Sequence, residues 1–125
     1  MNFTAIIQAR VGSKRLKKKI LRKIGKKTVI EILLERLKYS KKINKIIIAI
    51  PNTKQNDSLF KKLKKLNYEV FRGDENNVLK RYYDCAKKFK IDNIIRITSD
   101  CPLIDPELID NGIHLFKKNN IDYLS

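Results

Sequence analysis

The stretch FTAIIQARVGSKRL, residues 3–16, decides the fold because an apolar strand runs directly into a basic, glycine-containing loop. Phe3 to Ile7 has the length and composition of a buried strand. A loop at the carboxyl end of a first parallel strand presents backbone N–H groups to an anion. Four cations follow the strand and suit a polyanion, namely Arg10, Lys14, Arg15 and Lys19. The segment therefore indicates phosphate binding in an α/β protein, and the alternative is a solvated basic turn.

A second buried strand, Asn93 to Thr98, ends in the polar, proline-containing turn Ser99 to Pro106. Asp100 then lies at the carboxyl end of that strand. In a doubly wound sheet of order 3-2-1-4, the first and fourth strands are neighbours at the ligand crevice. Cations for a triphosphate and a carboxylate for Mg²⁺ are the groups that nucleotidyl transfer needs. The alternative for Asp100 is a turn residue that accepts hydrogen bonds from local N–H groups.

Strand-length apolar runs alternate four times with helical periodicity along the whole chain. The pairs are Phe3–Ile7 with Val29–Leu37, Ile46–Ile50 with Leu59–Leu66, Tyr68–Phe71 with Val78–Phe89, and Ile94–Ile97 with Leu108–Phe116. Nearly continuous apolar strands are typical of parallel strands covered by helices on both faces. We predict a single domain, residues 1–125, folded as a three-layer α/β/α sandwich with a mostly parallel, Rossmann-like sheet.

Three helix starts carry recognisable signals. Thr28 followed by Glu31 predicts a capping box, and Asp57 is predicted to cap the second helix. Asp105 followed by Pro106 places proline at the first position of the last helix. These signals set the expected beginnings of the helices.

The formal charge of +16 invites a polyanion-binding interpretation. Lysine outnumbers arginine by 22 to 7, and isoleucine and asparagine are also abundant, a combination that an AT-rich coding sequence produces. On the predicted second helix the lysines occupy the face opposite the apolar one and are expected to be solvated: Lys61, Lys62, Lys64 and Lys65. We do not expect nucleic acid as the partner, although a non-catalytic basic module that binds nucleotide or RNA stays an alternative.

Neither a membrane span nor a cysteine-based site is expected. No apolar run approaches the ~20 residues that a membrane helix needs, so the predicted location is the cytoplasm without a membrane partner. The two cysteines, Cys85 and Cys101, are too few for a zinc cluster and are predicted to be free thiols.

Three sequence blocks, taken together and in order, carry a resemblance to a known family. They are IIQARVGSKRL with Lys19 (residues 6–19), VFRGD with VLKRYY (residues 70–74 and 78–83), and RITSDCPLID (residues 96–105). The chain resembles the cytidylyltransferases that activate sugars, namely the acylneuraminate and 3-deoxy-manno-octulosonate enzymes and especially the spore-coat polysaccharide type. The resemblance covers the amino-terminal portion of a typical member and implies a nucleotide-diphospho-sugar transferase-like fold.

The resemblance implies CTP as the nucleotide, Mg²⁺ as the cofactor, and transfer of CMP to a sugar or acidic sugar for surface polysaccharide. The implied catalytic residues are Arg10, Lys19 and Asp100, of which Asp100 would ligate the metal. The implied nucleotide-binding residues are Ala9, Arg10, Gly12, Ser13, Arg15, Lys19, Arg72 and Arg81. For Arg72 and Arg81 the alternative is a surface cation on a strand or helix.

The chain departs from the family at two points. The family commonly has Pro-Gly where this chain has Lys17-Lys18, so the loop lacks a preset bend and a permissive glycine. The family's carboxyl-terminal half supplies a second metal-binding aspartate, most of the sugar pocket and the parts through which members tend to form homodimers. We therefore expect a truncated domain, and a degenerate subunit that needs a partner is a further alternative.

Overall fold

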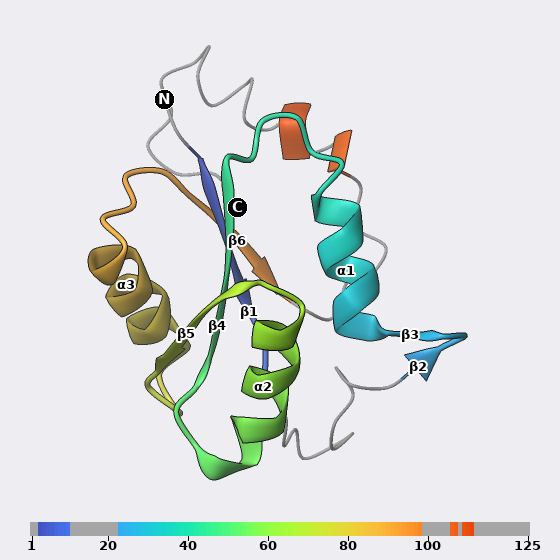
Figure 1. Cartoon of the computed structure of the whole chain (residues 1–125). Coiled ribbons are helices and arrows are strands. Elements are labelled where there is room, and N and C mark those ends of the chain that lie inside the picture. Colours follow the sequence, from blue (N-terminus) through green and yellow to red (C-terminus); the bar gives the residue numbers. More distant parts are fainter. Residues whose placement is uncertain (1–2, 11–22, 99–105, 108, 112–125) are drawn as a thin grey trace.

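The computed structural model describes residues 3–10, 23–98, 106–107 and 109–111. Its main sheet contains β1 (Thr4–Gln8), β4 (Lys45–Pro51), β5 (Glu69–Gly73) and β6 (Ile94–Thr98). The spatial order is β5-β4-β1-β6, and every pair is parallel. This order is the predicted 3-2-1-4 arrangement, which is therefore confirmed (Figure 1).

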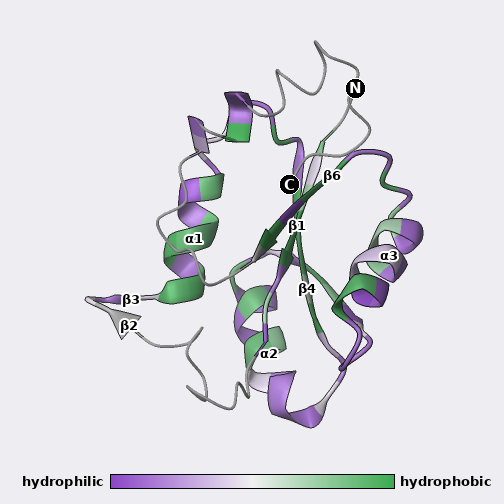
Figure 2. Cartoon of the chain, turned by 180° about the vertical axis from the view of Figure 1, so that it is seen from behind, coloured by the Kyte–Doolittle hydropathy of each residue, from purple (hydrophilic) through white to green (hydrophobic). Residues whose placement is uncertain are grey.

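Helices cover both faces of the sheet and make three layers (Figures 1 and 2). The helices α1 (Val29–Leu37) and α2 (Asp57–Lys65) pack on one face, and α3 (Val78–Lys88) packs on the other. Successive strand residues point to opposite faces, so Ile7 joins the core under α1 and α2 while Ile6 joins the core under α3. The predicted α/β/α sandwich is confirmed.

The strand register brings the carboxyl ends of the strands to one edge of the sheet, the lower edge in Figure 1. At the end of β1, Gln8 lies opposite both Ala49 of β4 and Thr98 of β6. The end of β5 lies at the same edge, because Gly73 pairs with Pro51. The chain that follows β1 therefore starts between two strands, as a ligand loop at a topological switch point does.

The capping box at the start of α1 is confirmed. The Glu31 amide donates to Thr28 Oγ1 at 3.3 Å, and Glu31 Oε1 accepts from Thr28 N at 3.5 Å. The predicted cap by Asp57 is wrong. Asn56 occupies the N-cap of α2 without a side-chain cap bond, and Asp57, the first residue of the helix, binds Arg72 instead.

Two features near α1 extend the predicted pattern. A short hairpin, β2 (Lys23–Ile24) with β3 (Lys27–Thr28), precedes the helix and turns at Gly25, whose φ is +68°. The loop after α1 binds the fourth helical segment, because the amides of Lys41 and Lys42 donate to the Asp110 carboxylate at 2.8 and 3.1 Å. Asp105 and most of the predicted helix 108–116 lie outside the described residues, whereas Pro106 is described and is helical.

The side chains of the α2 lysines divide into two groups. Lys61, Lys64 and Lys65 are exposed, as predicted. Lys62 is not simply solvated, because its Nζ lies 2.9 Å from Glu31 Oε1 and joins α2 to α1. In the described part of the chain, Cys85 is a free, buried thiol, and burial raises its pKa to about 12. Cys101 lies outside the described residues.

The ion pair on α1 predicts a specific pH dependence of stability. The hydrogen bond from Lys62 holds the pKa of Glu31 below its ordinary value of 4.5, and Thr28 lowers it further. As the pH falls, the unfolded chain binds the proton at a higher pH than the folded protein does. The contribution of the ionised Glu31 to the free energy of unfolding is therefore present above pH 4.5 and is lost as the pH falls below that value. Glu31→Gln keeps a capping-box side chain but removes the charge.

We expect the wild type to be more stable than Glu31→Gln at pH 7, with the difference shrinking as the pH falls below 4.5. Urea unfolding at pH 7 and pH 3.5 measures it. Glu69→Gln, a change at an exposed position, is the control. An equal difference at both pH values would contradict a role for the Glu31 charge.

Candidate functional site

The predicted site residues divide into those that the structure describes and those that it does not. Ala9, Arg10, Arg72 and Arg81 are described. The remaining predicted residues lie outside the described ranges, and their roles stay predictions: Gly12, Ser13, Arg15, Lys19 and Asp100. The geometry of the site is therefore built from the end of β1, the end of β5 and the start of α3.

The chain leaves β1 in a fixed position. Ala9 is fully buried, and its amide donates to the carbonyl of Ala49 at 3.1 Å, which continues the pairing with β4 beyond the end of β1. Arg10 follows immediately and is exposed. The first cation of the predicted phosphate loop therefore emerges from a rigid anchor at the carboxyl edge of the sheet.

Arg81, on α3, is completely buried, with a relative exposure of 0%. Its Nη1 donates to the carbonyls of Asp74 and Glu75 at 2.7 and 3.5 Å. Within the described residues, its Nε and Nη2 have no hydrogen-bond partner. Burial lowers the pKa of Arg81, and the positive charge of Arg10 lowers it further. The surface-cation alternative is wrong for Arg81.

Gly73 permits this close packing. A Cβ at this position would lie 2.7 Å from Cε2 of Phe71 and 3.0 Å from Cγ of Arg81. Real Cβ atoms are essentially never found as close as the first of these contacts. The glycine thus lets the Arg81 side chain pass against the end of β5.

The segment that joins β5 to α3, residues 73–77, forms its own hydrogen bonds. Asp74 Oδ1 accepts from the amides of Asn76 and Asn77 at 3.0 and 2.8 Å. These amides, that of Asn77 first, hold the pKa of Asp74 below its usual range. Asn77 caps α3 by accepting from the Lys80 amide at 2.9 Å. We refer to residues 73–77 as the β5–α3 loop.

Sequence reasoning did not place the β5–α3 loop in the site. The sequence did contain a signal for this loop. Asp74 and Asn77 form an Asp-x-x-Asn run directly before an apolar helical pattern, and such a run supplies a turn residue and an N-cap. α3 is further tied to β6 across the sheet, where the hydroxyl of Tyr82 donates to the carbonyl of Ile97 at 3.1 Å. The loop and the start of α3 are thus held against the same edge as Ala9.

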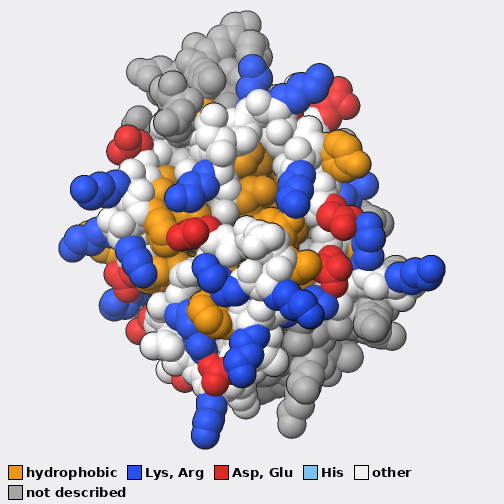
Figure 3. Space-filling view, viewed as in Figure 1, with side chains coloured by type: hydrophobic (Ala, Val, Ile, Leu, Met, Phe, Trp, Pro, Cys, Tyr) orange, Lys and Arg blue, Asp and Glu red, His pale blue; other side chains and the backbone are white. Residues whose placement is uncertain are grey.

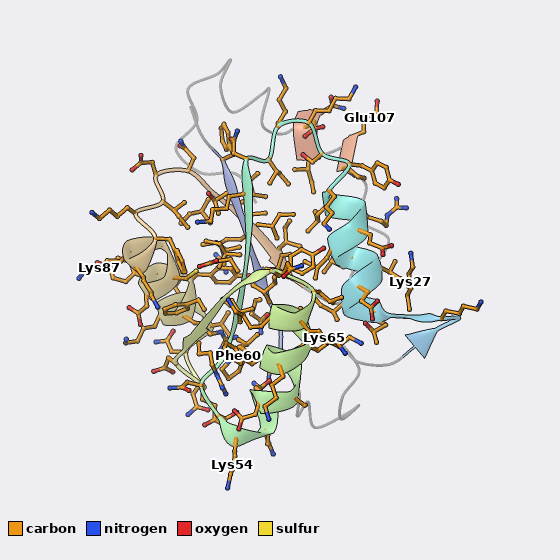
Figure 4. The ribbon with its side chains drawn as sticks, in the orientation of Figure 1. Lys27, Lys54, Phe60, Lys65, Lys87 and Glu107 are labelled. Atoms are coloured by element: carbon orange, nitrogen blue, oxygen red, sulfur yellow. The ribbon has the colours of Figure 1, made fainter. Side chains whose placement is uncertain are left out.

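Arg72 lies on the other face of the sheet and binds α2. Its Nη1 is 2.8 Å from Asp57 Oδ1, and its Nη2 donates to the carbonyl of Thr53 at 2.6 Å. Its guanidinium lies over the Phe60 ring, 5.3 Å from the ring centroid, and Figure 4 shows Phe60 between α2 and β5. The charge of Arg10 therefore acts on Arg81, whereas the Arg72 guanidinium lies on the opposite face of the sheet.

Lysine and arginine side chains are spread over the face in Figure 3, with acidic side chains among them. Within the described residues, no three metal-ligating side chains form a cluster. No helix among those residues is both long enough and apolar enough to span a bilayer.

Comparison with known proteins identifies the family. A family model described as cytidylyltransferase matches residues 4–125, which is nearly the whole chain. The chain belongs to the cytidylyltransferase family. The resemblance carried by the three sequence blocks is therefore confirmed, and so is the amino-terminal position of the match.

Relatives of this cytidylyltransferase chain are about twice its length. The spore coat polysaccharide biosynthesis protein SpsF of Bacillus subtilis is 38% identical over 94% of this chain and 51% of its own length. An uncharacterised protein of Methanocaldococcus jannaschii is 48% identical over the whole chain and 51% of its own length. The solved structure of a cytidylyltransferase from Leptospira borgpetersenii has a TM-score of 0.89 at 40% identity, covering 95% of this chain and 50% of that one.

These comparisons confirm the nucleotide-diphospho-sugar transferase-like fold. The chain spans about half the length of the curated relatives that it matches. The family and the fold are therefore established, whereas the reaction of the 125-residue chain is a matter for proposal.

The contacts of Arg72 predict a structural contribution. Arg72→Met removes the bond to the Thr53 carbonyl and the pair with Asp57, so we expect a loss of about 1–3 kcal/mol in the free energy of unfolding. Urea unfolding measures this loss. Lys61→Met, a change at an exposed position of α2, is the control. Unchanged stability together with lost CTP binding would instead assign Arg72 to the nucleotide, as the family resemblance implies.

Proposed function

We propose that the chain forms the nucleotide half of a cytidylyltransferase that transfers CMP from CTP to a sugar or acidic sugar for surface polysaccharide. The observation that carries the proposal is the family match over residues 4–125. The polysaccharide assignment is supported by the similarity to the spore coat polysaccharide protein of B. subtilis. The anchored start of the basic loop at Ala9, followed directly by the exposed Arg10, supports an anionic ligand at this edge.

In the proposed reaction an oxygen of the acceptor attacks the α-phosphorus of CTP in line, and pyrophosphate leaves. Such transfer depends on positioning and on stabilising negative charge as it moves toward the leaving group. Arg10 and Lys19 are proposed to neutralise the triphosphate, with Ser13 and Arg15 as further contacts. The main chain at Ala9 and Gly12 is proposed to approach the nucleotide, as the family resemblance implies.

A divalent metal, Mg²⁺ in our proposal, would supply additional positive charge to the phosphates when bound. Asp100 is the proposed ligand and follows β6, the neighbour of β1, and Arg10 comes two residues after the end of β1. Because metal-ligating residues form no cluster in the described part of the chain, no further ligand is proposed. Carboxylate oxygens are the ligands that Mg²⁺ prefers.

Calorimetric titration of CTP, ATP, GTP and UTP, each with and without Mg²⁺, tests the proposal. We expect selective binding of CTP that Mg²⁺ strengthens. Arg15→Ala, Lys19→Ala and Asp100→Asn are each expected to weaken CTP binding about tenfold or more, because a charge-assisted contact contributes roughly 1.5–3 kcal/mol. Their melting temperatures are expected to change little.

Lys64→Ala is the matched control, since it removes an exposed lysine from α2 at a distance from the basic loop. Equal, weak binding of all four nucleotides that salt abolishes, with no effect of Asp100→Asn, would support the basic-module alternative instead. Binding of CTP without turnover, followed by turnover once a family carboxyl-terminal half is added, would identify a subunit that needs a partner.

A further inference from the structure

Arg81 is a buried cation without an acidic partner in the described part of the chain. None of the ion pairs formed there includes Arg81, although the side chain is fully buried. The Asp74 carboxylate acts electrostatically on Arg81 but forms its hydrogen bonds with the amides of Asn76 and Asn77. Burying a charge is costly unless it is paired, and Arg10 increases the cost by adding a like charge nearby.

The hydrogen bonds that Arg81 does make go to the backbone of the β5–α3 loop. Nη1 reaches the carbonyls of Asp74 and Glu75, two consecutive peptide groups, from within the protein. The same loop is also held by Asp74 Oδ1, which accepts from the amides of Asn76 and Asn77. Two sets of hydrogen bonds therefore fix the loop: the Arg81 guanidinium binds two carbonyls of the loop, and the Asp74 carboxylate binds two of its amides.

Gly73 is fitted to the Arg81 side chain. Phe71 and Gly73 face α3 from the end of β5, and a Cβ at Gly73 would meet Cγ of Arg81 at 3.0 Å. Because such a Cβ would also lie 2.7 Å from Cε2 of Phe71, we expect a larger residue here to displace both the Phe71 ring and the arginine stem. Gly73 and Arg81 thus form one packing unit under the loop.

We propose that Arg81 is a positioning residue that acts through the β5–α3 loop rather than by contact with the nucleotide. Through its hydrogen bonds to the carbonyls of Asp74 and Glu75, it fixes the peptide orientations of the β5–α3 loop. This inference rests on the proposed function, because it assigns the loop to the same nucleotide site. It also gives a reason for a buried charge at this position despite its energetic cost. A loop that is already ordered binds its ligand without the entropic cost of ordering it first.

Two substitutions disturb this unit in different ways, and both are tested in the full 125-residue chain. Arg81→Met replaces the guanidinium with an apolar side chain and leaves Gly73 unchanged. Gly73→Ala retains the charge but displaces its stem. Lys80→Met is the matched control, since Lys80 is an exposed cation on the same turn of α3. Arg81→Lys keeps the charge but lacks the planar fork that can reach two carbonyls.

The first measurement is amide hydrogen exchange and backbone chemical shifts of Asn76, Asn77 and Lys80 without nucleotide. We expect Arg81→Met and Gly73→Ala to speed exchange at these amides about tenfold and to shift the same resonances. Lys80→Met is expected to leave the exchange of Asn76 and Asn77 unchanged, and Arg81→Lys to restore protection only in part. The melting temperature of Arg81→Met is expected to stay near that of the wild type, because the variant also removes an unpaired buried charge.

The second measurement is CTP affinity, expected to fall about tenfold or more in both Arg81→Met and Gly73→Ala. Lost CTP binding in Arg81→Met with unchanged loop amides would overturn the proposal and make Arg81 a contact residue. Unchanged amides in Gly73→Ala would overturn it as well, even if Arg81→Met failed to fold. If the wild type does not bind CTP, the proposed function fails, while the amide measurement still decides whether Arg81 positions the loop.

Discussion

The pairing of β1 with two parallel neighbours is the constraint on which the rest of the structure depends. β1 lies between β4 and β6, so its buried residues need apolar cover on both faces. The two cores that result fix α1 and α2 on one side and α3 on the other. Because parallel strands end at one edge, this arrangement places the starts of the basic loop, the β5–α3 loop and the segment after β6 together.

Arg72 on β5 and Arg81 on α3 show how differently one residue type is used on the two faces of the sheet. Arg72 is neutralised by Asp57 and stacks on Phe60, so it joins β5 to α2. Arg81 has no carboxylate partner among the described residues and lies near another cation. Strain and uncompensated charge tend to concentrate at functional sites. The face under α3 carries the uncompensated charge of Arg81, whereas on the face under α2 the charge of Arg72 is paired with Asp57.

Sequence patterns predicted the elements well where the pattern is local. The capping box at Thr28 and Glu31 satisfies amides within one turn, so it follows from the sequence alone. The cap predicted at Asp57 was wrong because a tertiary partner, Arg72, takes its carboxylate. The β5–α3 loop was not predicted as part of the site, because its relation to Arg10 depends on packing between distant segments.

The sequence by itself determined the strand-helix alternation and the three motif blocks that identify a cytidylyltransferase, whereas the sheet order is seen in the structure. The alternation and the motif blocks depend on apolar periodicity and on residue order, and both can be read from the linear sequence. Only the tertiary structure decided which arginine is buried and which one is paired with a carboxylate. Those choices depend on the strand face from which a side chain points and on the helix that covers that face, and residue types do not encode them locally.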